Sequence, residues 1–281
     1  MTQISADNLV RNRSVTIGSQ AFDLVSDDHY LDAIGQNFEP DMCRLFQSIT
    51  KNTDTVFDIG ANIGCTALYF AQIAHQVHAF EPSPSTFRYL EANVSQSGLT
   101  NIVLHNFGLG PRNETVELTY NPAMRAGAFI SDHAEPGISH QRETIEIRKG
   151  DACLSAASEV QVIKIDVEGF ELNVIDGLSE TLSRNQPVVA LELNHWCLNA
   201  FQRMSVPDFF DRILAVFPLV YAVDQDVYVD LTQEGERYWV MYYHITRFRY
   251  PNLVCAFHPE QLEGFYAAFQ PKAYRGRPDP E

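Results

Sequence analysis

Two short stretches, residues 56–65 and residues 77–82, constrain the fold of this chain more than any other feature. The first reads VFDIGANIGC and the second reads VHAFEP. In order, they predict an apolar strand, a glycine loop, a helix, a second apolar strand and an acidic residue where that strand ends. This succession is typical of α/β domains that bind a nucleotide at the edge of a parallel sheet.

The alternation of strands and helices continues along the chain. Apolar runs predict further strands at residues 102–107, 160–165, 187–193, 219–223 and 253–257. This pattern favours a Rossmann-like α/β fold, with a mostly parallel sheet and helices on both faces. Ligands of such sheets bind beyond the carboxyl ends of the strands. The sequence places there Asp58, Glu81, Phe107, Gly108, Asp166 and Glu192.

The domain organisation follows from where this alternation begins and ends. Residues 1–50 are predicted to form an N-terminal extension with a short hairpin and a helix, and residues 51–260 the main domain. Within that domain, residues 121–141 show no strand or helix period and residues 224–249 are polar and aromatic, and both segments are predicted as loop insertions. Residues 261–281 are predicted to contain a C-terminal helix and a frayed tail.

Charge and composition exclude several classes of partner. The formal net charge is −16, from 20 basic and 36 acidic side chains, so a nucleic-acid backbone would be repelled. Five widely spaced cysteines without a C-x-x-C pair favour reduced thiols in a cytoplasmic protein. Neither a signal peptide nor an apolar run of the roughly 20 residues needed to cross a bilayer is visible. The oligomeric state stays open, a homodimer included.

The glycine loop predicts the kind of cofactor. Asp58 ends the first strand, and the loop Gly60, Ala61, Asn62 and Gly64 follows with G-x-x-x-G spacing in place of the G-x-G-x-x-G of dinucleotide sites. Loop amides at a helix start favour a carboxylate, and an acid favours an ammonium group. S-adenosylmethionine offers both groups. A tight strand-to-helix turn without a ligand would show the same glycines, but Asp58 favours the cofactor.

The next two strand ends extend the predicted cofactor site. Glu81 offers two carboxylate oxygens that can accept hydrogen bonds from both ribose hydroxyls. Pro82 and Ser83 adjoin it, and Ser83 is also a good helix N-cap. Asn106, Phe107 and Gly108 close the third strand, where an amide edge and an aromatic face suit adenine. Simple core packing of Phe107 explains that residue equally well.

Charged residues at two later strand ends are candidate catalytic groups. Lys164, Asp166 and Glu168 interrupt an otherwise apolar strand terminus, where unpaired charge is rare. Glu192 and His195 follow the next strand, with Asn194 between them. His195 and Glu168 rank first as general bases, while Asp166 suits ordering of the cofactor or acceptor. A structural Lys164–Asp166 ion pair and a surface His195 remain alternatives.

These motifs together resemble the FkbM family of methyltransferases. The segments that carry the resemblance are residues 56–64, 79–84, 162–169 (VIKIDVEG) and 191–194, and Glu39-Pro40 ahead of the first strand adds to it. The resemblance spans roughly residues 35–260. It implies a seven-stranded sheet with an antiparallel last strand, S-adenosylmethionine as methyl donor, and O-methylation of a sugar or natural product. It also adds Glu39 to the cofactor-binding residues.

The resulting hypothesis is methyl transfer to a hydroxyl of a small-molecule or carbohydrate acceptor, without a metal. N-methyl transfer and Mg²⁺-assisted transfer through Asp166, Glu192 and Asn194 are alternatives on the same fold. A NAD-dependent oxidoreductase and a non-catalytic cofactor-binding protein are alternatives of other classes. The acceptor pocket is predicted from residues 121–141, 196–204 and 228–243, which are rich in loop-forming and aromatic residues.

Overall fold

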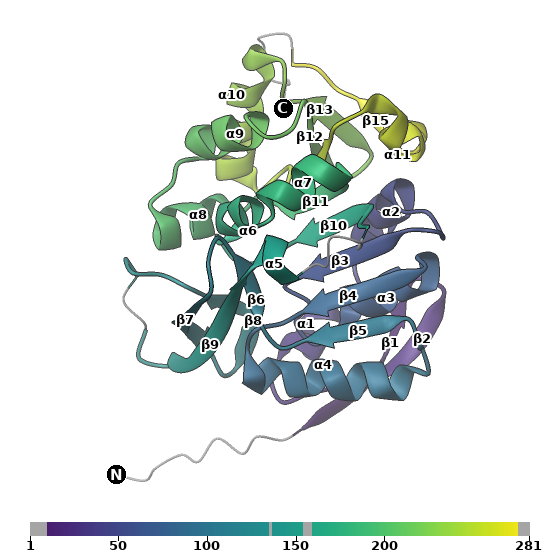
Figure 1. Ribbon diagram of the computed structural model, residues 1–281, viewed down its shortest axis with the longest axis vertical. Coiled ribbons are helices and arrows are strands. Elements are labelled where there is room, and N and C mark those ends of the chain that lie inside the picture. The colour runs from purple at the N-terminus through teal and green to yellow at the C-terminus, as the bar shows by residue number, and fades with distance from the viewer. Residues whose placement is uncertain (1–9, 135–136, 154–158, 275–281) are drawn as a thin grey trace.

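A large twisted sheet organises the computed structural model, which describes residues 10–134, 137–153 and 159–274 (Figure 1). Within these residues the sheet has nine strands in the order β15-β13-β12-β14-β11-β10-β3-β4-β5. Its strands are β3 (Thr55–Ile59), β4 (Gln76–Phe80), β5 (Ile102–His105), β10 (Val162–Ile165), β11 (Val188–Glu192), β12 (Leu219–Asp224), β13 (Val227–Asp230), β14 (Asn252–Ala256) and β15 (Gln270–Pro271).

Strand direction confirms the predicted fold class. The run from β5 to β12 is parallel except for β14, which is antiparallel to both neighbours, β11 and β12. The sheet differs from the expected seven strands because β13 and β15 extend its β12 edge. The chain reverses after Asp224, so β13 pairs antiparallel with β12. The predicted seven-stranded sheet is therefore present, with two short strands added.

Both faces of this sheet are buried, because neighbouring residues of each strand pack into separate hydrophobic clusters. Val56 packs with one cluster and Phe57 with the other, and Val162 and Ile163 divide in the same way. The first cluster is covered by α2 (Pro40–Ile49), α3 (Cys65–Ile73), α4 (Pro84–Ser97) and α11 (Glu263–Ala268). The second is covered by α6 (Glu171–Gly177), α7 (Ser179–Asn185), α9 (Val206–Leu214) and α10 (Glu234–Arg247).

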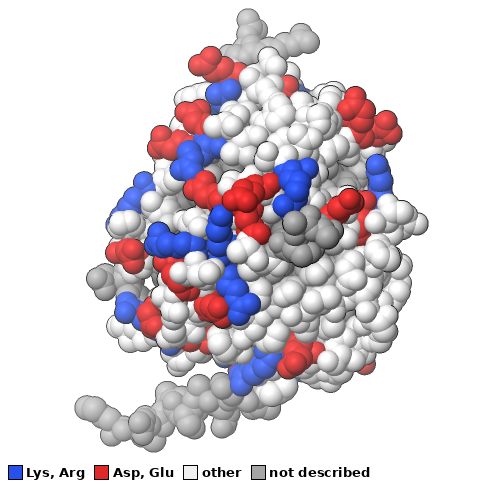
Figure 2. Space-filling view, in the orientation of Figure 1, with Lys and Arg blue, Asp and Glu red and all other residues white. Residues whose placement is uncertain are grey.

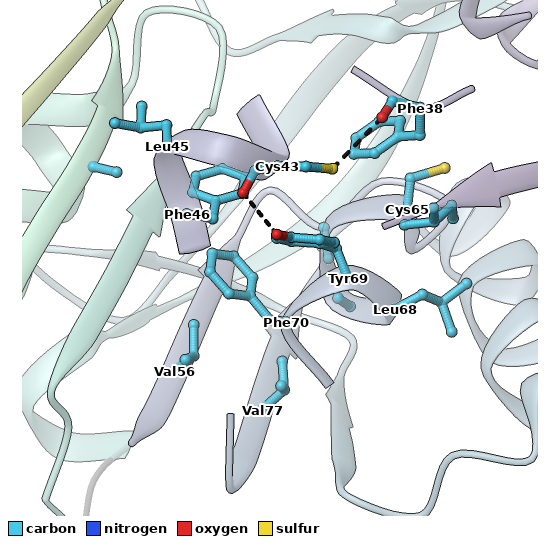
Figure 3. Packing of buried hydrophobic residues seen from close by; sticks show 14 of the residues in the cluster. Phe38, Cys43, Leu45, Phe46, Val56, Cys65, Leu68, Tyr69, Phe70 and Val77 are labelled. Carbon is cyan, nitrogen blue, oxygen red and sulfur yellow. Dashed lines mark hydrogen bonds between the residues drawn. The ribbon is translucent and has the colours of Figure 1, made fainter. Parts of the chain in front are cut away.

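Aromatic packing joins α2 to α3 above the first face (Figure 3). The rings of Phe46 and Phe70 have centroids 4.6 Å apart, and both lie over the strand residues Val56 and Val77. The Tyr69 hydroxyl donates a hydrogen bond of 2.7 Å to the carbonyl of Cys43. This packing fixes the N-terminal end of α2, and with it Glu39, against the helix that follows the glycine loop.

A smaller sheet and a hairpin flank the central sheet. The strands β6 (Gly108–Gly110), β7 (Glu114–Asn121), β8 (Met124–Phe129) and β9 (Gln141–Lys149) form a four-stranded sheet beside its β5 end. The predicted N-terminal hairpin is formed by β1 (Arg11–Ile17) and β2 (Gln20–Ser26), and α1 (Tyr30–Ile34) follows it. The remaining short elements are α5 (Gly150–Cys153), α8 (His195–Gln202) and the 3-10 helix η1 (Pro259–Leu262).

Several predicted segments differ from the structure. Residues 121–141 contain β8, which pairs with β7, so this insertion is not a continuous loop. Residues 224–249 contain β13 and α10 in place of a loop. The segment after β10 forms two short helices, α6 and α7, which meet at Leu178. The predicted C-terminal helix corresponds to α11, while most of the predicted frayed tail, residues 275–281, lies outside the described residues.

The surface mixes charges of both signs. Figure 2 shows Lys and Arg interspersed with Asp and Glu on the face it presents. In the part of the chain that the structure describes, no helix is both long and apolar enough to cross a membrane.

Candidate functional site

A cavity of about 270 Å³ lies beyond the carboxyl ends of β3, β4, β10 and β11. It is also lined by Tyr30 of α1 and by residues of β8. Most of the predicted site residues meet here. Those that line it are Glu39, Gly60, Ala61, Asn62, Glu81, Pro82, Ser83, Gly108, Lys164, Asp166, Glu168 and Glu192. The predicted residues that do not line it are Asp58, Gly64, Asn106, Phe107 and His195.

The glycine loop crosses the end of β10 at very short range. Gly60 has φ +81, and a Cβ built there would lie 1.9 Å from the carbonyl oxygen of Asp166. A side chain at position 60 would therefore separate the first loop from the charged segment after β10. Gly64 acts differently, because its Cβ would meet Leu90 of α4 at 2.8 Å. Gly64 thus permits helix packing, while Gly60 brings two parts of the cavity wall together.

Asp58 stabilises this loop from behind. Its carboxylate is fully buried, and Oδ1 lies 3.2 Å from Nζ of Lys164. The Thr66 hydroxyl donates to Oδ2 at 2.5 Å. Lys164 also donates to the Gly60 carbonyl at 2.7 Å, so the ion pair holds the loop backbone directly. The oxygens of Asp58 face Lys164 and Thr66, and contact of Asp58 with a cofactor ammonium group stays a prediction.

Lys164 is the central cation of the site. Burial lowers its pKa, but the carboxylates of Asp58 and Asp166 outweigh burial and raise the pKa. Its Nζ lies 3.6 Å from Asp166 Oδ2, so the structural ion pair considered from the sequence is present as well. Lys164 is only 3% exposed and contacts Asp58, Gly60 and Asp166 at once.

The two carboxylate oxygens of Glu81 connect the glycine loop after β3 to the turn after β4. The amide of Asn62 donates to Oε2 at 3.0 Å, and the amide of Ser83 donates to Oε1 at 2.9 Å. Burial raises the pKa of Glu81 to about 7, and these two amides lower it only in part. Each carboxylate oxygen can accept a further hydrogen bond, so two ligand hydroxyls can still be bound.

The third strand end contributes backbone and packing in place of an adenine-reading side chain. The Asn106 side-chain amide donates to the Glu81 carbonyl at 2.9 Å and stabilises the turn there. Phe107 packs against Phe80, and the Arg148 guanidinium lies 4.0 Å from its ring centroid. The packing alternative for Phe107 therefore agrees with the structure. Gly108 remains in the cavity wall, with Leu109 beside it.

Three carboxylates meet at the end of β10 and β11. Oxygens of Asp166, Glu168 and Glu192 lie within 4.8 Å of one another. Burial, followed by Asp166, raises the pKa of both Glu168 and Glu192. Oε2 of Glu192 is buried and has no hydrogen-bond partner among the described residues. The pKa of Glu168 is raised to about 7, close to the pH at which a general base is most effective.

The backbone of residues 167–169 is strained, and Glu171, which had no predicted role, holds it by hydrogen bonds. Glu168 has φ +51, a left-handed conformation that side chains adopt rarely. The amides of Val167 and Gly169 donate to Oε1 of Glu171 at 3.3 and 3.0 Å. The Cys197 thiol donates to Glu168 Oε2 at 3.0 Å. The sequence signal for Glu171 was an acid in an otherwise apolar helix face.

His195 lies outside the cavity. It begins α8, and its backbone amide donates to Nε2 of His244 at 3.2 Å. The two imidazole rings meet edge-on with centroids 5.0 Å apart, and Phe248 packs against His195 from α10. His195 does not line the cavity, and its ring packs against His244 and Phe248, so its role as general base stays a prediction.

Arg125 and Tyr30 line the cavity and were missed from the sequence. Arg125 lies on β8, is 8% exposed, and forms a buried ion pair with Asp27 at the end of β2. Tyr30 lies on α1 close to Cys65. Neither residue stands at the end of a predicted strand, so the strand-end rule gave no signal for them.

Stability should fall as pH rises from about 5.5 to 8, because the fold raises the pKa of several buried carboxyls. Glu81 and Glu171 have pKa values raised to about 7, chiefly by burial. The folded state therefore binds more protons than the unfolded chain between their unfolded and folded pKa values, and the stabilisation is lost as pH rises through 7. Thermal unfolding at pH 5.5 and at pH 8 measures this loss of stability. Glu171→Gln should reduce the dependence of the melting temperature on pH. An unchanged dependence would show that the raised pKa of Glu171 does not contribute to it.

The fold and the cavity together define a class I methyltransferase architecture, with a glycine loop after the first strand and an acid after the second. The Methyltransferase FkbM domain profile matches residues 58–222. The chain therefore belongs to the FkbM methyltransferase family.

Curated relatives agree with this assignment. The chain is 31% identical over 146 residues to the hexuronic acid methyltransferase AglP of Haloferax volcanii, covering 51% of this chain and 58% of AglP. It is 28% identical over 171 residues to the 31-O-demethyl-FK506 methyltransferase FkbM of Streptomyces tacrolimicus, covering 50% of this chain and 65% of that protein. The matched region thus spans less than two thirds of each relative.

Among solved structures, a methyltransferase FkbM from Methylobacillus flagellatus aligns with a TM-score of 0.42 and 18% identity. The alignment covers 61% of this chain and 42% of that one.

Proposed function

We propose that this chain transfers a methyl group from S-adenosylmethionine to a hydroxyl of a sugar, glycoconjugate or natural product. The observation that supports it best is the charge of the cavity. Glu39, Glu81, Asp166, Glu168 and Glu192 all line it. The two cations in its wall already have partners, since Lys164 pairs with Asp58 and Arg125 pairs with Asp27.

The pKa values of Glu39, Glu81, Glu168 and Glu192 are all raised, chiefly by burial, so a cationic ligand that favours their ionised form would be bound in preference to an anionic one. S-adenosylmethionine has a sulfonium and an ammonium group, whereas NAD brings a pyrophosphate that these carboxylates would repel. The residues present also suit the uncharged parts of the cofactor. Glu81 has acceptor capacity for two ribose hydroxyls, and α3 begins at the cavity wall, where its N-terminus favours a carboxylate.

When bound, S-adenosylmethionine supplies an electrophilic methyl group on a cationic sulfur. The protein contributes position and proton transfer. Lys164 and Gly60 hold the loop against Asp166, and Glu171 holds the segment that contains Glu168. The pKa of Glu168 is raised to about 7, so its carboxylate can take the proton of an acceptor hydroxyl near neutral pH, and Glu192 lies beside it.

Calorimetric titration tests the cofactor directly. We expect S-adenosylmethionine and S-adenosylhomocysteine to bind, and NAD to show no heat of binding under the same conditions. The sulfonium should add affinity, because S-adenosylhomocysteine lacks that charge. Binding of NAD with neither adenosyl ligand would favour an oxidoreductase, and binding of none of the three would favour a non-catalytic protein. Glu168→Gln should still bind S-adenosylhomocysteine, since that substitution keeps the size of the side chain.

A second candidate is metal-assisted transfer on the same site. The oxygens of Asp166, Glu168 and Glu192 are close enough to share one hard cation. We expect S-adenosylhomocysteine binding to be unchanged, within about twofold, after exhaustive chelation with EDTA. A large loss that Mg²⁺ restores would instead favour the metal-assisted reaction. The expected result follows because Lys164 already supplies positive charge 3.6 Å from Asp166.

A further inference from the structure

A second cavity, of about 500 Å³, opens beside the first over the ends of β10, β11 and β12 and the start of β14. Its walls come from the first turns of α2, the turn after β12, the segment before β14, and Phe269. The residues that line both cavities are Glu39, Met42, Lys164, Asp166 and Glu192. One layer of side chains therefore separates the two spaces.

This shared wall contains reactive groups. Asp166 and Glu192 border both cavities, whereas Glu168 borders only the first. Methyl transfer is an in-line displacement, so acceptor and donor must approach the transferred carbon from opposite sides. Two cavities that meet at a pair of carboxylates provide two such directions of approach. The segments predicted from sequence to form the acceptor pocket, residues 121–141, 196–204 and 228–243, do not line the second cavity.

The charges of the second cavity restrict what it can hold. Carboxylates in its wall come from Glu39, Asp41, Asp166, Glu192 and Asp224. The nearby cations already have acidic partners: Lys164 pairs with Asp58, Arg249 with Asp224 at 2.5 Å, and Arg44 with Asp226. Because each of these cations already has an acidic partner, none is left to bind an anionic acceptor, and a ligand that donates hydrogen bonds to the carboxyl groups is favoured.

The polar groups of this wall suit a hydroxylated ligand. Gln225 and Asn252 offer amide groups beside the carboxylates. Hydroxyl or ammonium donors can meet the carboxylates, and hydroxyl oxygens can accept hydrogen bonds from the amides. The apolar side chains of the wall, Leu45, Phe46 and Phe269, are at most 2% exposed and form the core behind it.

We propose that the second cavity binds the methyl acceptor, and that this acceptor is an uncharged or cationic sugar, with Glu192 as its base. This inference rests on the proposed function. The acceptor oxygen forms a bond to the methyl carbon as the carbon–sulfur bond breaks, and the electron pair of that bond remains on sulfur. The hydroxyl proton passes to Glu192, whose Oε2 has no hydrogen-bond partner among the described residues.

Saturation-transfer NMR with three methyl glycosides tests the site. The probes are methyl glucoside, methyl glucosaminide and methyl glucuronide, each added to protein saturated with S-adenosylhomocysteine. We expect saturation transfer to the glucoside and the glucosaminide, with the glucuronide at least fivefold weaker. Transfer to none of them, or equal affinity for glucuronide and glucosaminide, would overturn the proposal.

Two charge-reversal variants locate the binding. Asp41→Arg changes an exposed residue at the second cavity, and Asp23→Arg makes the same change on β2, away from both cavities. Asp41→Arg should weaken glucosaminide binding and strengthen glucuronide binding, each about fivefold, while Asp23→Arg should change neither. Equal effects of the two variants would overturn the site.

Calorimetry with S-adenosylhomocysteine on the same samples separates the two proposals. Failure of the wild-type protein to bind it contradicts the proposed function itself. Normal binding in all three proteins, combined with glycoside binding that ignores Asp41, contradicts the acceptor site alone.

Discussion

Replacing Lys164 with methionine will lower the free energy of unfolding by about 3–5 kcal/mol, the cost of leaving one partner of a buried ion pair without the other. Without Lys164, the Asp58 carboxylate would be a buried charge without a cationic partner, because it has no access to solvent and lies 3.2 Å from Lys164 Nζ. The Gly60 carbonyl loses its hydrogen bond from Lys164 as well. Urea denaturation followed by circular dichroism measures the change.

Two further variants control this measurement. Lys149 pairs with Glu180 at the surface, where both side chains are well exposed, so Lys149→Met should cost less than about 1 kcal/mol. Adding Asp58→Asn to Lys164→Met should restore part of the loss, because the buried charge is then removed. A Lys164→Met protein as stable as Lys149→Met would show that Asp58 does not depend on this lysine.

The Asp58–Lys164 pair also shows what the sequence could not predict. Both residues were singled out as charges at strand ends, and each was given a separate role. The structure places β3 and β10 side by side with Asp58 opposite Lys164 in the parallel register. Register between strands more than 100 positions apart depends on the whole sheet, and no local pattern reports it.

Local patterns predicted the parts of the fold that are buried on both sides. Residues 55–59 were predicted as a strand and form β3 with the same bounds, because continuous apolar runs flanked by turn residues are typical of central parallel strands. The segment that forms β8 reads MRAGAF, and its strand conformation depends on pairing with β7. Such pairing supplies hydrogen bonds that a short sequence without a clear polar and apolar alternation does not reveal.

The site residues also divide into those that local sequence patterns predicted and those whose positions depend on distant parts of the chain. Most residues at strand ends did converge on one cavity, since parallel strands present their carboxyl ends at one edge. His195 does not line this cavity. Its ring packs against His244 of α10 and against Phe248, which follows that helix, and this segment was predicted as a loop. Glu171 and Thr66 support the site from within helices, where an apolar-face pattern hides a single polar residue.

Replacing Glu81 with alanine will weaken S-adenosylhomocysteine binding about 100-fold in calorimetric titrations. We expect its carboxylate to accept hydrogen bonds from both ribose hydroxyls. A hydrogen bond to a charged group contributes about 1.5–3 kcal/mol, so the loss of two corresponds to at least about two orders of magnitude in affinity. Glu81→Gln keeps one acceptor oxygen and should weaken binding only about tenfold.

Affinity of the wild-type protein should also fall as pH decreases through 7, because the pKa of Glu81 is raised to about 7 and its protonated form accepts fewer hydrogen bonds.

The matched control is Glu143→Ala. Glu143 accepts hydrogen bonds from the Ser83 and Ser85 hydroxyls at the same loop, yet it does not line the cavity. We therefore expect its loss to change affinity less than about threefold, while any general loosening of the loop would weaken binding in both proteins.

Glu81 also accepts hydrogen bonds from the amides of Asn62 and Ser83, so circular dichroism must show that Glu81→Ala remains folded. A folded Glu81→Ala protein with wild-type affinity would place the ribose elsewhere, and equal losses in Glu81→Ala and Glu143→Ala would attribute the effect to the loop and not to the carboxylate.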